Sequence, residues 1–159
     1  MEIDIAAPEE LSEISITAGA LGSKLAQAYS LERIAGEKMR AYLSSLPAYC
    51  QKVKKPHSEI RVKDLYDMVR ISRERNLSDL VFWSNAAQEF ERACRSRFVD
   101  CHGWTSFSER WHDTELLFDS DPTLPKDVTF LEVNELLPKI VQLWERLGVI
   151  PKKYEITGK

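Results

Sequence analysis

Several features that define particular protein classes are scarce or missing in this chain of 159 residues. It has no apolar run of roughly 18 residues, the length that a membrane-spanning helix needs. It starts with acidic rather than basic residues, and no hydrophobic segment follows them, so we expect no signal peptide. These absences predict a cytoplasmic protein without a membrane span.

Cysteine is also scarce, with Cys50, Cys94 and Cys101 as the whole complement. Their number is odd and no Cys-x-x-Cys pair occurs, which argues against both a disulfide framework and a zinc ribbon. We expect the three thiols to be reduced and mostly structural.

The residues that are present suit one soluble domain over 1–159, since 43% are hydrophobic and 30% are charged. Periodicity predicts a mostly α (α+β) fold, a helical bundle with one to three short N-terminal strands. The expected segments are short strands and loops in 1–29, two motif helices in 30–75, a helical bundle in 78–148 and a tail in 149–159.

The net charge of −3 is unevenly distributed along the chain. Residues 50–75 contain eight Lys or Arg against four acids, whereas residues 1–15 contain five acids and no base. A basic middle between acidic flanks suits a ligand that carries phosphate. The alternative is an ordinary solvated charged face.

The first motif helix is expected to begin after Ser30, whose hydroxyl can cap it. When the residues are placed around a helix at 100° per residue, apolar side chains fall on one arc, and Arg33, Gly36 and Arg40 fall on the opposite side. The arc comprises Leu31, Ile34, Ala35, Met39, Tyr42 and Leu46. Lys38 falls in the middle of this arc, either as a side chain that extends to water or as a cation held in a cleft for an anionic ligand.

The second motif helix, from Val62, also has a charged residue at its apolar arc, and here the charge is negative. Its apolar arc includes Leu65, Met68 and Val69, and Asp64 projects at the edge of that arc. If the two arcs pack together, Lys38 and Asp64 meet at the mouth of a cleft. A structural ion pair is the alternative interpretation.

These two segments carry a family resemblance. The run Tyr29-Ser-Leu-Glu-x-x-x-x-Glu-Lys-x-Arg-Ala, followed by Arg61-x-Lys-Asp-Leu-Tyr-Asp, resembles the second half of AbiEii-type nucleotidyltransferases, the toxins of type IV toxin–antitoxin systems. The resemblance is strongest over 26–70 and implies the C-terminal half of a nucleotidyltransferase fold. It implies that Lys38 and Asp64 are catalytic, with Arg61, Lys63 and Asp67 as substrate-binding neighbours.

The resemblance also implies Mg²⁺, a nucleoside triphosphate, an RNA acceptor such as the 3′ end of tRNA, and an antitoxin protein. Glu2 and Asp4 alternate with apolar residues on an expected N-terminal strand, where family members place a metal-binding carboxylate. Gly22-Ser23 is not followed by the Asp-x-Asp of this superfamily. We therefore expect a truncated member or fragment, and the sequence leaves open whether it is an enzyme.

Two other functions remain open at this stage. One is a non-catalytic helical module that binds nucleic acid or a partner. The other is a metal-independent ribonuclease, because the Arg-x4-His spacing of Arg97 and His102 resembles the motif of HEPN domains. A structural histidine explains the same spacing.

The remaining boundaries are predicted from caps and turns. We expect strands at 13–17 and 25–29, a helix capped by Ser78 that Gly103 ends, and one short helix over 104–118. A capping box from Thr129 to Glu132 is expected to start the last helix, which should bury Leu147 before Gly148 ends it.

Overall fold

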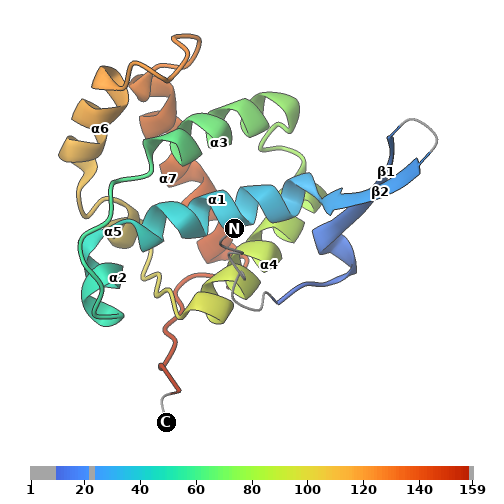
Figure 1. Ribbon diagram of the computed structural model, residues 1–159, viewed down its shortest axis with the longest axis horizontal. Coiled ribbons are helices and arrows are strands. Elements are labelled where there is room, and N and C mark those ends of the chain that lie inside the picture. The colour runs from blue at the N-terminus through green and yellow to red at the C-terminus, as the bar shows by residue number, and fades with distance from the viewer. Residues whose placement is uncertain (1–9, 22–23, 158–159) are drawn as a thin grey trace, which may run out of the picture.

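Helices make up most of the computed structural model, which describes residues 10–21 and 24–157 (Figure 1). The elements are η1 (Glu13–Ser15), β1 (Ile16–Leu21), β2 (Lys24–Tyr29), α1 (Leu31–Ser44), α2 (Pro47–Lys52), α3 (Val62–Glu74), α4 (Leu80–Arg97), α5 (Trp104–Phe107), α6 (Trp111–Ser120) and α7 (Phe130–Arg146). The predicted fold class, mostly helical with short N-terminal strands, is confirmed.

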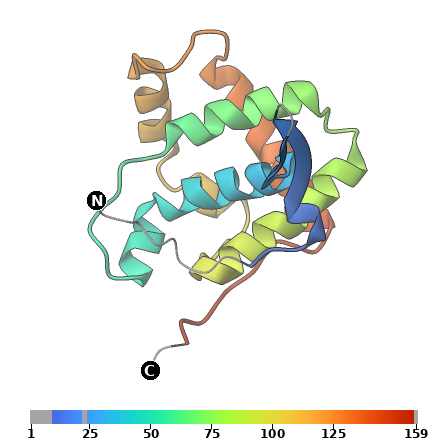
Figure 2. The same ribbon diagram turned by 45° about the vertical axis from the view of Figure 1, so that its right-hand side comes forward.

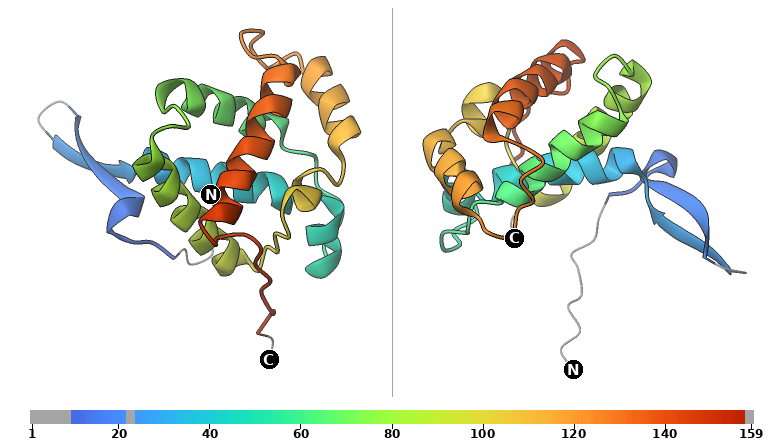
Figure 3. Two further views of the ribbon diagram at one scale, coloured as in Figure 1. Left: turned by 180° about the vertical axis from the view of Figure 1, so that it is seen from behind. Right: turned by 90° about the horizontal axis from the view of Figure 1, so that it is seen from above.

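The two strands form an antiparallel hairpin that projects from the helical body (Figure 3). Its register runs from Ile16 opposite Tyr29 to Leu21 opposite Lys24. The strand expected over 13–17 begins only at Ile16, because Glu13–Ser15 form a 3₁₀ turn. That turn is favoured by the hydroxyl of Ser15, which accepts from the Ser12 backbone N–H at 2.8 Å.

Helix α1 lies at the centre of the fold, between α3 and α4 (Figure 2). The predicted cap is confirmed, since Ser30 Oγ accepts from the Arg33 backbone N–H at 3.1 Å. Met39 and Tyr42 are fully buried as expected. The side of α1 opposite the apolar arc is covered as well, because α4 packs on it and buries Arg33 and Gly36.

Helix α4 is capped by Asp79 rather than Ser78, and the Asp79 carboxylate accepts from the Phe82 backbone N–H at 3.1 Å. It ends at Arg97, well before Gly103, because Phe98 adopts the left-handed conformation with φ of 58°. The expected apolar face is buried against the core. Its buried members include Trp83, Ala86, Ala87, Phe90, Ala93 and Cys94.

The C-terminal half follows the expected order with shifted boundaries. The helix expected over 104–118 is divided into α5 and α6 by a turn. The Thr129–Glu132 capping box is present at the start of α7. Leu147 is 45% exposed, so its predicted burial is wrong: it follows the last turn of α7, where Trp144 fills the core instead.

Residues 149–159 were expected to form a tail, and several contacts tie the described part of this segment to the helices. Lys152 pairs with Cys101 in an isolated antiparallel bridge. Asp100 accepts from the Tyr154 backbone N–H at 2.8 Å and from Lys52 Nζ at 2.7 Å. Cys50, Cys94 and Cys101 are free and buried, in agreement with the sequence. None of the described helices is both long and apolar enough to cross a membrane.

Candidate functional site

Lys38 lies at the seam between α1 and α3, where two carboxylates of α3 hold its ammonium group. Lys38 Nζ is 3.1 Å from Asp64 Oδ1 and 2.7 Å from Asp67 Oδ2. The predicted proximity of Lys38 and Asp64 is therefore confirmed. The Lys38 side chain remains 29% exposed.

Asp64 is the buried member of this cluster, with a side chain only 1% exposed. It lies in the first turn of α3, where the positive end of the helix dipole favours a carboxylate. Its second oxygen accepts from Nε of Arg61, the residue before the helix. Cations on both oxygens offset the cost of burying this charge.

The electrostatics keep the lysine charged. Burial would lower the pKa of Lys38, but hydrogen bonds and charges from Asp67 and Asp64 outweigh burial and raise it above its ordinary value. The hydrogen bond to Asp64 likewise raises the pKa of Arg61. The site therefore presents two permanent cations around one buried carboxylate.

Arg61 joins this cluster to two surface hollows. One of about 410 Å³ is lined by Arg61, Lys63, Asp121 and Thr123. The other, of about 510 Å³, lies between Arg61 and Arg40 on α1. Arg61 is 57% exposed, and neither hollow is lined by Lys38 or Asp64. The two motif helices thus place Arg61 at the edge of the open space, whereas Lys38 and Asp64, which were expected at the mouth of a cleft, line neither hollow.

The acids of this site do not fit a magnesium ion. Both oxygens of Asp64 already contact cations, and Asp67 contacts Lys38. Among the described residues, no group of three or more His, Cys, Asp or Glu side chains is arranged to hold a metal. The predicted metal ligands Glu2 and Asp4 lie outside the described residues.

A second buried charge cluster, which the sequence interpretation missed, lies on the other side of α1. Arg33 and Glu89 are both fully buried, with Nη1 of Arg33 3.2 Å from Oε2 of Glu89. Glu89 also accepts from the hydroxyl of Ser15 at 2.7 Å and from Arg92 at 3.0 Å. The sequence signal for this cluster was Glu89, an acid on the apolar arc of α4, one position before Phe90.

The residues of the ribonuclease alternative are near the end of α4. Arg97 is the last residue of that helix, and its carbonyl accepts from the Tyr49 hydroxyl at 3.0 Å. His102 lies on the following loop, is exposed, and lines a separate cavity with Lys52 and Asp100.

The fold and site define a mostly helical domain in which a lysine is held between two carboxylates. The family described as "Nucleotidyl transferase AbiEii toxin, Type IV TA system" matches residues 1–145, so the chain belongs to this family of nucleotidyltransferase toxins. No curated protein and no solved structure gives a match.

Proposed function

We propose that this chain takes part in nucleotidyl transfer to RNA and that Lys38 binds the phosphates of the nucleoside triphosphate. Family membership supports the reaction class. The observation that carries the role of Lys38 is its ammonium group, which two carboxylates fix in place while the side chain stays partly exposed. An oriented ammonium in a partly dry site neutralises phosphate charge better than a mobile surface lysine.

The neighbours of Lys38 have distinct proposed roles. Asp64 is a positioning residue, because it is buried and holds Lys38 and Arg61 together. Arg61 keeps its remaining guanidinium donors for phosphate, since only Nε contacts Asp64. Lys63 lies beyond Arg61 in the hollow next to Thr123, where it can contact the RNA acceptor.

The site proposed here is only part of a transferase site. No Asp-x-Asp follows Gly22-Ser23 within several residues, as it does in this superfamily, and the described acids do not form a metal site. We therefore expect no transfer by these 159 residues alone. Membership in a toxin–antitoxin family supports an antitoxin protein as a partner.

The proposed role of Lys38 is tested by competition of ATP, AMP and adenosine against a fluorescent ATP analogue. Lys38→Met should weaken ATP binding about tenfold, the effect of losing one charge-assisted contact of about 1.4 kcal/mol. Lys38→Arg should retain most of the affinity, and adenosine binding should not change. Lys139→Met, on the exposed side of α7, is the matched control.

Equal ATP affinity of Lys38→Met and wild type would reject the proposed role. Melting temperatures are measured in parallel, because Lys38→Met leaves the buried Asp64 with one cation fewer. A second assay supplies labelled nucleoside triphosphates, Mg²⁺ and total tRNA. Label incorporation that Lys38→Ala abolishes would show that the chain transfers nucleotide without additional residues.

A further inference from the structure

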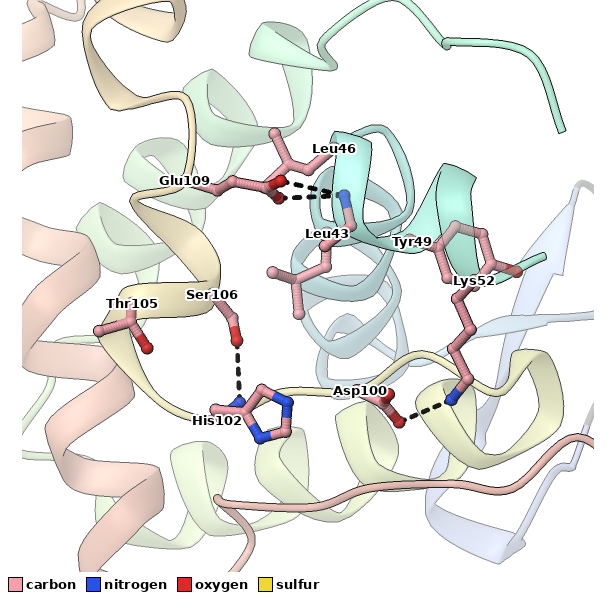
Figure 4. Close-up of a pocket in the computed structure, with 10 residues that line it drawn as sticks. Leu43, Leu46, Tyr49, Lys52, Asp100, His102, Thr105, Ser106 and Glu109 are labelled. Carbon is pink, nitrogen blue, oxygen red and sulfur yellow. Dashed lines mark hydrogen bonds and ion pairs between the residues drawn. The ribbon is translucent and has the colours of Figure 1, made fainter. Parts of the chain in front are cut away.

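A cavity of about 290 Å³ lies away from Lys38, between the C-terminal end of α1, α2 and α5 (Figure 4). Its size is at the lower end of small-molecule sites, which span about 300 to 1,000 Å³. Nothing in the proposed transfer site accounts for it. Its lining combines apolar, aromatic and polar side chains, as the lining of many ligand sites does.

The polar lining is held in place by its own contacts. Both oxygens of Glu109 accept from the Ala48 backbone N–H, at 3.0 and 3.3 Å. Lys52 pairs with Asp100 at 2.7 Å on the other side of the cavity. Figure 4 shows these pairs on opposite sides of the space, so the cavity has hydrogen-bonding groups at two edges.

His102 contributes a side chain whose ring nitrogens are available. Its backbone N–H donates to Ser106 Oγ at 2.9 Å, which orients the residue beside the cavity. Its imidazole makes no hydrogen bond or ion pair with any residue in 10–21 or 24–157. The ring can therefore stack on a planar ligand or hydrogen-bond to its edge.

The remaining lining includes two leucines and one aromatic ring. Leu43 and Leu46 are almost completely buried at one side. Tyr49 lines the cavity, and its ring already carries the Lys55 ammonium 5.0 Å from its centroid. A ring system that combines an apolar face with polar edges fits such walls.

The cavity is lined by Lys52 together with the acids Asp100 and Glu109, and further cations line the neighbouring hollows. An adjoining hollow shares Tyr49 and Lys52 with it and adds Lys54 and Arg97. Lys55, above the Tyr49 ring, also lines the hollow that reaches Arg61. Phosphates of a chain that runs from Arg61 toward this cavity would pass Lys55 and then Lys52.

We propose that the cavity binds the base of an unpaired nucleotide of the RNA, while the surrounding lysines contact its phosphates. This inference rests on the proposed function, in which the chain engages an RNA acceptor. Proteins recognise single-stranded RNA by stacking bases on aromatic or imidazole rings and by hydrogen bonds to base edges. His102 and Tyr49 provide the rings, and Glu109 and Thr105 provide polar groups for the edges.

The test measures fluorescence anisotropy of an unstructured uridylate decamer and of the same decamer without bases. His102→Ala should weaken binding of the uridylate decamer about tenfold, in line with about 1–3 kcal/mol for one stacked base. Thr105→Trp should have a similar effect, because it fills the cavity from an exposed position without removing a described contact. Neither variant should change binding of the abasic decamer.

His112→Ala is the matched control, because His112 is an exposed histidine of α6 that does not line the cavity. A direct readout is the imidazole proton signal of His102 by NMR, which should shift on addition of uridine monophosphate while that of His112 stays in place. Melting temperatures of all variants should match the wild type.

Uridylate and abasic decamers that bind equally, or affinity for uridylate that is unchanged in His102→Ala, would overturn the base site. So would the absence of RNA binding by the wild type. The ATP competition with Lys38→Met is independent of these assays. If Lys38→Met does not weaken ATP binding but His102→Ala weakens uridylate binding, only the proposed role of Lys38 is rejected. If Lys38→Met weakens ATP binding but His102→Ala leaves uridylate binding unchanged, only the base site is rejected.

Discussion

Gly36 of α1 lies directly against the backbone of Phe90 in α4. A Cβ added to Gly36 would be 2.5 Å from the Phe90 nitrogen and 2.8 Å from the Glu89 carbonyl carbon. Real Cβ atoms do not approach backbone so closely. The central helix pair therefore packs at a distance that only glycine permits at this position.

Gly36→Ala should separate α1 from α4 and destabilise the protein. Overpacking of a tight contact costs about 1–3 kcal/mol, more than the gain in helix propensity of about 1 kcal/mol. Urea denaturation followed by circular dichroism should show a lower midpoint. Gly19→Ala, where an added Cβ meets nothing within 4 Å, is the control; equal midpoints for the two variants would contradict the prediction.

Arg33 and Glu89 should show strong energetic coupling, because both side chains are fully buried and paired at 3.2 Å. Removing one partner of a buried pair costs up to about 3–5 kcal/mol. Here the remaining charge keeps one neighbour, Glu37 for Arg33 or Arg92 for Glu89, but loses its fully buried counter-charge. The double variant Arg33→Met/Glu89→Leu should therefore be less destabilised than the sum of the single variants. Free energies of unfolding from a double-mutant cycle measure this coupling; additivity within about 0.5 kcal/mol would show that the pair is not coupled.

The sequence predicted local features of α1 and α7 well, because caps depend on neighbouring residues. Ser30 and Thr129 cap their helices as expected. The burial of Arg33 could not be predicted in the same way, since its partner Glu89 is 56 residues away. Helical periodicity reports one apolar arc, and it does not show that a second helix covers the opposite side.

The sequence predicted those residues of the candidate site whose charge interrupts an apolar arc of a helix. Lys38 and Asp64 were anomalous on their helices, and the anomaly of each is explained by the other. The cavity beside His102 gave no such signal. It is built by α1, α2, α5 and the loop after α4, so only the tertiary fold brings its lining together.

Tyr42 should make the protein sensitive to alkaline pH. Burial raises its pKa to about 12, so the folded state keeps the phenol proton after the unfolded state has lost it. The stability from this residue is complete below pH of about 10 and falls by about 1.4 kcal/mol per pH unit between about 10 and 12. In Tyr42→Phe, the free energy of unfolding should decrease less over this pH range.

At neutral pH the same substitution should cost about 1 kcal/mol. It removes the hydroxyl that bonds to the Phe107 carbonyl at 3.1 Å and to Thr114 Oγ1 at 2.9 Å. Urea midpoints measured from pH 7 to pH 11 test both effects. Wild-type and Tyr42→Phe curves that stay parallel over this range would show that Tyr42 does not titrate as inferred.

Asp67 should compete with phosphate for Lys38. Its carboxylate lies 2.7 Å from Lys38 Nζ and is 40% exposed, whereas Asp64 holds the same ammonium from a buried position. Asp67→Asn removes a negative charge from the solvent side and breaks an exposed ion pair, which costs about 0.2–1 kcal/mol of stability. ATP should then bind several-fold more tightly, with a weaker effect at high salt because screening reduces the repulsion that was removed.

Asp64→Asn should behave differently from Asp67→Asn. It leaves Lys38 and Arg61 beside a buried amide that cannot balance their charge, so the melting temperature should fall and ATP binding should not improve. ATP competition at low and physiological salt, with melting curves, separates the two aspartates. Tighter ATP binding in Asp64→Asn, or weaker binding in Asp67→Asn, would mean that the two carboxylates have the opposite roles and that Asp67 positions the lysine.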